Sequence, residues 1–220
     1  LKNKNLPDQY SFGGSIDLSG KTNNDFIGGS VSLYTRKKHF FATARATILD
    51  YGDYRVPTDT VAIHSYNVQL HNNQLRNTAG KEQNIHASFG MVKDQFRSIF
   101  NVSNVHTKYG FFANAHGLEP RNVNRNIHDR SSRDILYPYQ DVNHFKIINR
   151  TSYKSEKWLF ESDLGYQINF RQEWSQYSQH GYMPAVFPEN IDFNPELERQ
   201  FEKDIYLSLI HISEPTRPYW

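Results

Sequence analysis

Cysteine is absent from the 220-residue sequence, which excludes disulfide bonds, thiolate metal sites and a cysteine nucleophile. No run of about 18 apolar residues occurs, so the sequence predicts no transmembrane helix. An excess of charge of one sign is also lacking, because 25 Lys and Arg residues are nearly balanced by 23 Asp and Glu residues. This balance argues against a nucleic-acid partner. No signal peptide or initiator Met is recognisable, which is typical of an internal piece of a longer protein.

Apolar residues are scarce as well, at 37% of the sequence, against about 45–50% in ordinary globular domains. Aromatic residues are plentiful, with 15 Phe, 14 Tyr and 3 Trp. Disordered segments are poor in such residues. The chain is therefore expected to fold, with polar filling and an aromatic-rich apolar surface.

Hydrophobicity alternates with a period of two, which is typical of strands with one apolar and one polar face. In residues 158–174 the even-numbered positions are mostly apolar and the odd-numbered positions are mostly polar or charged. The same pattern recurs over 40–48, 83–92 and 145–153. Five residues fall on the wrong face, and a β-bulge would restore part of the pattern. They are Phe41, Leu49, Asp50, Ile148 and Asn149.

Tight polar turns alternate with long irregular connections along the chain. The tight turns, each containing Lys, are expected at 35–39, 92–95 and 153–157. The long stretches are expected at about 55–78, about 114–143 and about 179–198. An earlier pair of strands, at about 10–19 and 26–35, joins through 21–25. Together these segments predict about eight antiparallel strands.

The expected hairpin arms are long, at about 12–17 residues, whereas globular strands usually have about 5–6. Aromatic residues bracket the arms at separations of 14 to 16 residues, in the pairs Phe40 and Tyr54, Phe96 and Phe112, and Trp158 and Trp174. With about 3.3 Å per residue and a tilt of about 40°, such arms span roughly 35–40 Å, which suits an apolar band of about 25 Å with an interfacial layer on each side. The pattern predicts an all-β antiparallel transmembrane β-barrel with short periplasmic turns and long extracellular loops.

Three strings give the sequence a family likeness. Residues 76–82, 110–121 and 169–175 read RNTAGKE, GFFANAHGLEPR and NFRQEWS. With these strings, residues 1–206 resemble part of the β-barrel of a TonB-dependent outer-membrane receptor of the Bacteroidetes type. The resemblance implies a barrel of about 22 strands, of which this chain holds about eight, closed by an N-terminal plug domain that is not in the chain.

The resemblance also implies a function and partners. It implies active uptake of a scarce, bulky nutrient across the outer membrane of a bacterial cell, with a ferric siderophore favoured and haem, cobalamin or an oligosaccharide as further possibilities. The implied partners are outer-membrane lipid, the plug domain, the TonB complex reached through the missing N-terminal part, and the extracellular ligand. No cofactor is expected. Two alternatives stay open: a soluble secreted all-β carbohydrate-processing module, and a passive porin or adhesin barrel.

The long stretch at 114–143 is the richest candidate for ligand contact. Four Arg and two Tyr side chains there suit an anionic, planar or catecholate-like ligand through charge-assisted hydrogen bonds and stacking. The alternative is a solvated loop held by internal ion pairs, such as Asp129 with Arg133. The candidates are His116, Glu119, Arg121, Arg125, Arg130, Arg133, Tyr137 and Tyr139.

Charged residues on the polar faces of the strands form a second set, which is expected to face the lumen or the plug. They are Arg45, Arg97, Lys146, Arg150, Glu161, Asp163, Arg171 and Glu173. The ten histidines show no metal-ligand spacing, so no metal site is predicted. No catalytic arrangement of Ser, His and Asp or of paired carboxylates is recognisable, and the chain is not expected to be an enzyme.

The end of the sequence has a different origin. Residues 207–217 read LSLIHISEPTR, which resembles the translation of a transposase-based sequencing adapter. Residues 207–220 are therefore expected to be a non-native tail, with the natural segment reaching Tyr206. A strand is expected to continue into the tail as far as about Ile212, because a free sheet edge accepts any extended apolar segment. Ser213 to Trp220 are expected to make few contacts.

Overall fold

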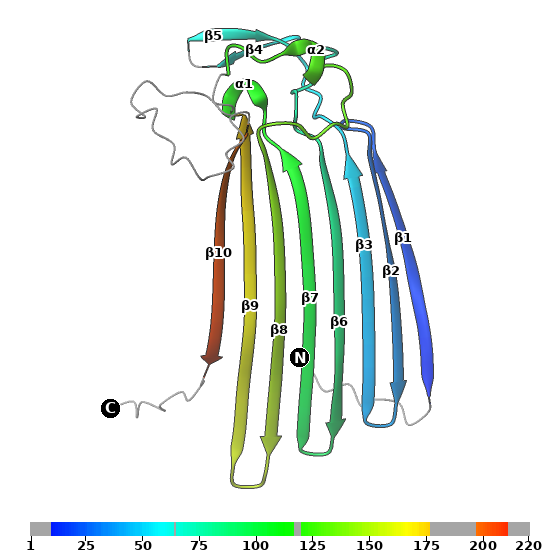
Figure 1. Cartoon of the computed structure of the whole chain (residues 1–220). Helices are drawn as coiled ribbons and strands as arrows, with labels where there is room; N and C mark the ends of the chain where they lie inside the picture. Colours follow the sequence, from blue (N-terminus) through cyan, green and yellow to red (C-terminus); the bar gives the residue numbers. More distant parts are fainter. Residues whose placement is uncertain (1–9, 64, 117–119, 177–196, 211–220) are drawn as a thin grey trace, which may run out of the picture.

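The computed structural model describes residues 10–63, 65–116 and 120–176, together with the backbone of 197–210. Most of these residues belong to one eight-stranded antiparallel sheet, which confirms the all-β antiparallel fold. Its strands, in spatial order, are β1 (Ser11–Lys21), β2 (Phe26–Lys37), β3 (Phe40–Tyr51), β6 (Gly80–Lys93), β7 (Phe96–Gly110), β8 (Tyr139–Lys154), β9 (Leu159–Gln176) and β10 (Leu197–Ile210). The sheet is open rather than closed into a barrel, and β1 and β10 form its two edges (Figure 1).

Short turns lie at one end of the sheet and long loops at the other (Figure 1). Two residues join β2 to β3, and two join β6 to β7; Lys38 and Asp94 in these turns have φ of 51° and 49°. The predicted tight turns are confirmed. The loop after β7 ends earlier than predicted, because β8 already begins at Tyr139. The predicted stretch at 179–198 lies largely outside the described residues.

Four small elements lie in the long loops, beyond the ends of the strands (Figure 1). They are the paired strands β4 (Thr60–Ile63) and β5 (Tyr66–Gln69) and the one-turn helices α1 (Ala113–His116) and α2 (Arg125–His128). We call residues 52–79 and 111–138, with the turn at 22–25, the loop layer. In the described part of the chain, no helix has the length and apolar character needed to cross a membrane.

The ladders between the long strands keep a constant register, so cross-strand partners share one face of the sheet. The apolar face carries the even-numbered residues of β1, β3, β7 and β9 and the odd-numbered residues of β2, β6 and β8. Many of its large hydrophobic side chains are 36–84% exposed, among them Ile16, Leu18, Leu33, Ile48, Ile85, Phe89, Phe100, Leu164, Tyr166 and Phe170.

The opposite face, the polar face, carries charged and hydroxyl side chains. Arg45, for example, donates hydrogen bonds to Ser30 Oγ at 2.6 Å and to Asp17 Oδ2 at 3.3 Å across three strands. In β9, Leu164 and Tyr166 lie on the apolar face and their alternating neighbours lie on the polar face. The alternation in the sequence therefore predicted the two faces correctly.

The described part of the sheet has no apolar core packed between two layers. The buried hydrophobic side chains among the described residues are Val68, Leu70, Ala79 and Ala113, and all four belong to the loop layer. The sheet itself is a single layer (Figure 1). Exposure of the apolar face to water is therefore unfavourable, and the sheet would be stabilised by apolar contacts that cover this face.

The β-bulge considered for β3 and β8 is wrong, because both ladders run without a break. The misplaced polar residues are accommodated by partners instead. Asp50 lies at the loop end of β3, where it meets Lys81 Nζ at 3.6 Å. Asn149 Nδ2 donates a hydrogen bond to Ser98 Oγ at 3.1 Å. A polar side chain on the apolar face therefore needs a neighbour, not a change of register.

The backbone of β10 pairs with β9 from Leu197 to Ile210. The strand thus continues past Tyr206 into the adapter-like string, as expected for an extended segment beside a sheet edge. It ends two residues before the predicted Ile212. The expectation for Ser213 to Trp220 lies outside the described residues.

Gly110, at the loop end of β7, supplies a test of the packing between sheet and loop layer. A Cβ atom there would overlap the backbone oxygen of Asn77 and lie 2.9 Å from its Cγ, so Gly110→Ala must displace Asn77. We expect a loss of about 1–3 kcal/mol in the free energy of unfolding, measured by urea titration in detergent micelles.

Gly20→Ala in β1 is the matched control. The nearest atom to its added Cβ is the Phe26 oxygen at 3.6 Å, an ordinary contact. This variant should stay within about 0.5 kcal/mol of the original chain. Equal losses in the two variants would contradict the close approach at Gly110.

Candidate functional site

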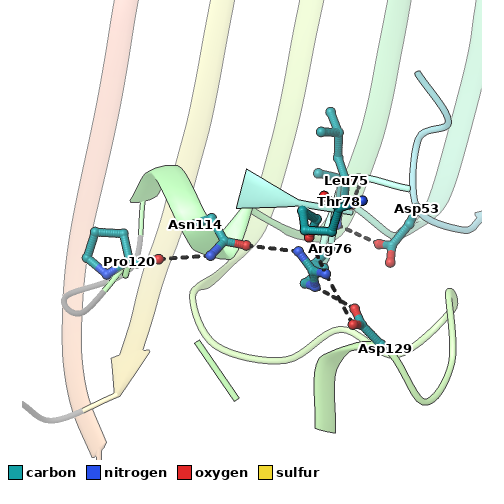
Figure 2. A network of polar contacts seen from close by, with 8 residues as sticks. Asp53, Leu75, Arg76, Thr78, Asn114, Pro120 and Asp129 are labelled. Carbon is teal, nitrogen blue, oxygen red and sulfur yellow. Dashed lines mark hydrogen bonds and ion pairs between the residues drawn. The ribbon is translucent and has the colours of Figure 1, made fainter. Parts of the chain in front are cut away.

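The loop layer holds most of the buried polar side chains of the described chain, so it is the first place to look for a site. Its centre is Arg76, whose side chain is only 3% exposed (Figure 2). Arg76 Nε and Nη2 donate to the two carboxylate oxygens of Asp129 at 2.5 and 3.2 Å. Nη1 donates to Asn114 Oδ1 at 3.3 Å, and Nη2 also donates to the Gln69 carbonyl at 2.7 Å. One guanidinium therefore joins β5, α1 and the residue that follows α2.

Asp53 fixes a second buried junction beside Arg76 (Figure 2). Its Oδ1 accepts hydrogen bonds from the backbone N–H groups of Thr78 at 2.7 Å and Ala79 at 3.0 Å. Burial raises the pKa of the Asp53 carboxyl to about 6, and repulsion from Asp129 adds to this rise, whereas the N–H donors oppose it. Asp53 therefore holds a proton more tightly than an ordinary carboxyl group.

Asn77 connects the two long loops. Its Nδ2 donates to the carbonyl oxygens of Pro138 at 2.7 Å and Phe111 at 3.0 Å, and its Oδ1 accepts from the Leu136 N–H at 2.6 Å. Its φ is 64°, in the left-handed region that Asn tolerates better than most residues. Asn at this position thus meets a backbone requirement and a hydrogen-bonding requirement together.

Arg133 extends the connection to the first hairpin. Its guanidinium pairs with the Asp50 carboxylate and donates to the Asp25 carbonyl at 2.5 Å. The neighbouring Ser132 carbonyl accepts from the Asp53 N–H at 2.7 Å. The loop between β7 and β8 therefore reaches across β6 and β3 to the turn between β1 and β2, and the layer behaves as one hydrogen-bonded unit.

The predicted ligand-contact residues are scattered rather than gathered in one place. Arg121 donates to Ser65 Oγ at 2.9 Å and lies over the Tyr66 ring, 5.1 Å from its centroid. Arg130 pairs with Asp134 at 3.1 Å, and Arg133 pairs with Asp50 rather than with Asp129, so the suggested Asp129–Arg133 pair is wrong. His116 and Arg125 are exposed on α1 and α2. Glu119 lies outside the described residues.

Two of the predicted contacts, Tyr137 and Tyr139, belong to a different surface. Tyr139 lies on the apolar face and stacks on Trp174 at 5.9 Å between ring centroids. Tyr137 stacks on Tyr139 at 5.4 Å. The Lys108 ammonium group lies 4.3 Å from the Tyr139 ring centroid. These rings therefore form a stack at the loop end of the apolar face, which Tyr137 joins from the loop layer.

The register places the second predicted set together on the polar face. Arg150 Nε lies 3.7 Å from Asp163 Oδ1, Arg171 pairs with Glu173, and Arg45 binds Asp17. The whole set is Arg45, Arg97, Lys146, Arg150, Glu161, Asp163, Arg171 and Glu173. Their contact with a lumen or a plug stays a prediction.

Sequence reasoning missed a row of side chains on the polar face just below the loop layer. Gln140 Nε2 donates to Glu173 Oε1 at 2.7 Å, and the Tyr109 hydroxyl donates to Gln140 Oε1. Tyr51 stacks on Phe26 at 6.5 Å in the same region. Of these residues, alternation placed only Glu173 on this face, and the alignment of the row depends on a register that the structure supplies.

No three His, Asp or Glu side chains of the described residues gather closely enough to hold a metal ion. Comparison with family models, with curated proteins and with solved structures finds no match to this chain. Any functional interpretation therefore rests on the sequence and the structure of this chain.

The raised pKa of Asp53 predicts how stability depends on pH. Because the folded chain binds this proton more tightly than the unfolded chain, the stabilising contribution is full below the ordinary carboxyl pKa of 3.8 and is lost as pH rises through about 6. Asp53→Asn removes this titration while keeping an oxygen acceptor. Urea unfolding midpoints should show the original chain losing stability relative to Asp53→Asn between pH 4 and pH 7.

Proposed function

We propose that the chain is part of the β-barrel of a TonB-dependent outer-membrane receptor that takes up a scarce, bulky nutrient, with a ferric siderophore favoured. The observation that carries the proposal is the exposed apolar face. From Phe160 to Phe170 it covers ten residue steps of β9, or about 33 Å along the strand and about 25 Å after a tilt of about 40°. This height equals that of the apolar band of outer-membrane barrels, about 25 Å.

The composition of this band supports contact with hydrocarbon. Over Phe40–Ile48 of β3, Gln83–Met91 of β6 and Phe96–His106 of β7, the apolar face carries no Asp, Glu, Lys or Arg. Hydrogen-bonding groups in a membrane interior need partners within the protein.

Three polar side chains within the band satisfy one another. Ser98 Oγ and Thr151 Oγ1 lie 2.9 Å apart, and Thr151 Oγ1 donates to Asn149 Oδ1 at 2.9 Å. Asn149 Nδ2 donates to Ser98 Oγ at 3.1 Å and to the Ile99 carbonyl at 3.3 Å. Three polar residues thus close a small network on β7 and β8 without help from water, which suits an apolar environment.

The unequal ends of the sheet support an orientation. Outer-membrane barrels have short periplasmic turns and longer extracellular loops. On this basis the turns at Lys38 and Asp94 lie on the periplasmic side, and the loop layer is extracellular. The ligand would arrive at exposed residues of that layer such as His116, Arg121 and Arg125, whose charges suit an anionic iron chelate.

The polar face would then line the lumen. Its ion pairs, such as Arg150 with Asp163 and Arg45 with Asp17, present paired charges to a plug domain. In the proposed cycle the ligand binds outside, and the TonB complex displaces the plug so that the ligand enters. A soluble carbohydrate-processing module would need a cover over the apolar face, and a passive porin would need no plug.

Lipid contact is tested by paired Trp substitutions in β6. Ile85 lies on the apolar face and His86 on the polar face, so the two positions differ by one residue and by one face. With Trp158, Trp174 and Trp220 replaced by Phe, Ile85→Trp should be quenched by lipids brominated in mid-chain, and His86→Trp should not. Equal quenching of the two variants, or none in either, would refute the membrane-facing assignment.

Uptake is tested in the bacterium that carries the gene. Deletion should abolish growth on one limiting nutrient, with ferric siderophore, haem, cobalamin and oligosaccharide supplied separately, and the restored gene should recover it. Dependence of that growth on the TonB complex separates a receptor from a passive porin. Unchanged growth on all four nutrients would refute the uptake function.

A further inference from the structure

A row of four charges crosses the apolar face between the apolar band and the loop layer. Lys81 on β6 and Lys108 on β7 are direct cross-strand partners. Asp50 on β3 is the partner of Lys81, and Asp141 on β8 is the partner of Lys108. We call these four residues the rim row. Ile48 and Phe170 lie on its band side, and Tyr139 and Trp174 lie on its loop side.

The rim row is not neutral once its contacts are counted. Asp50 is shared, because Arg133 pairs with one carboxylate oxygen and Lys81 Nζ lies 3.6 Å from the other. Asp141 Oδ1 is hydrogen-bonded to His106 Nε2 at 2.8 Å. Three cationic side chains therefore face two carboxylates, even with His106 uncharged.

Lys108 has the least compensated charge of the row. Within the described part of the chain, no carboxylate oxygen lies within 4.0 Å of its ammonium group, which instead lies over the Tyr139 ring. Like charges directly opposite each other on neighbouring strands are destabilising. An anion beside Lys81 and Lys108 would remove this repulsion.

The surroundings of the two lysines select the kind of anion. On one side the exposed apolar band offers contact to acyl chains, with Ile48 65% and Phe170 36% exposed. On the other side the stacked rings of Tyr139 and Trp174 suit the interface between hydrocarbon and water, where aromatic side chains of barrels gather. The two lysines thus lie at the loop end of the apolar band, beside aromatic rings of the interface, where the phosphate of a lipid whose acyl chains follow the band would come within their reach.

We propose that Lys81 and Lys108 bind the phosphate of an anionic membrane phospholipid, whose headgroup carries no balancing cation and whose acyl chains lie along the apolar band. This proposal rests on the proposed function, because it requires the apolar face to contact lipid. Basic residues beside a membrane surface attract anionic headgroups, and long Lys side chains reach such headgroups from the edge of the hydrocarbon. The rim row is then the place where the sheet recognises lipid charge.

The test uses the full chain in a non-ionic detergent, with Trp158 and Trp220 replaced by Phe so that Trp174 reports on the site. Phosphatidylglycerol, phosphatidylcholine and inorganic phosphate are titrated separately. We expect phosphatidylglycerol to change Trp174 fluorescence saturably and to bind more tightly than phosphatidylcholine. Lys81→Gln with Lys108→Gln should weaken phosphatidylglycerol binding by about fivefold for each lysine removed and leave phosphatidylcholine binding unchanged.

Two control pairs separate the site from general charge and from misfolding. Arg36→Gln with Lys154→Gln removes two cations from the polar face and should leave both affinities unchanged. Lys81→Arg with Lys108→Arg keeps the charge and should keep the preference for phosphatidylglycerol. Circular dichroism of each variant verifies that the strands are retained.

The outcomes separate this proposal from the function on which it rests. Equal affinity for the two lipids, or an equal loss in the polar-face pair, overturns the rim-row proposal. Inorganic phosphate that binds as tightly as phosphatidylglycerol also overturns it, since the site would then hold a free anion. If Ile85→Trp is quenched by brominated phosphatidylcholine while no headgroup preference appears, only the rim-row proposal fails. If that quenching is absent as well, the membrane-facing assignment fails with it.

Discussion

The unbroken antiparallel ladder is the constraint on which the rest of the structure depends. Because cross-strand partners stay in register from β1 to β9, every second side chain on seven strands faces the same side. One slip would move Ile85 or Leu164 to the polar face and Arg45 or Asp163 to the apolar face. The two faces, the band on one and the ion pairs on the other are therefore consequences of a single register.

Much of this arrangement could be predicted from the sequence, because a period of two maps directly onto the faces of a strand. Residues 158–174 alone predicted which side chains of β9 share a face. The exceptions could not be interpreted in the same way. Asp50 and Asn149 break the pattern, and a bulge was a reasonable explanation, but their partners Arg133 and Ser98 come from other parts of the chain.

The loop layer shows where local reasoning stops. Arg76 and Asp129 are separated by 53 residues and meet only because β6 and β7 bring their loops to the same end of the sheet. Both residues lie outside the alternating segments, so hydrophobic periodicity could not predict their contact. The alternative considered for this loop, a solvated loop held by internal ion pairs, was right in kind for Arg130 with Asp134. It was wrong for Asp129, whose partner lies in the preceding loop.

The contact of Arg133 with Asp50 connects the two surfaces for which functions are proposed. Asp50 belongs to the rim row on the apolar face, whereas Arg133 belongs to the loop layer, where a ligand would first arrive. Asp50 is shared between Arg133 and Lys81. A stronger interaction of the carboxylate with one of these cations therefore weakens its interaction with the other. An anion bound at Lys81 would therefore leave Asp50 more available to Arg133. Lipid charge at the rim would in this way strengthen the contact between the apolar face and the loop layer.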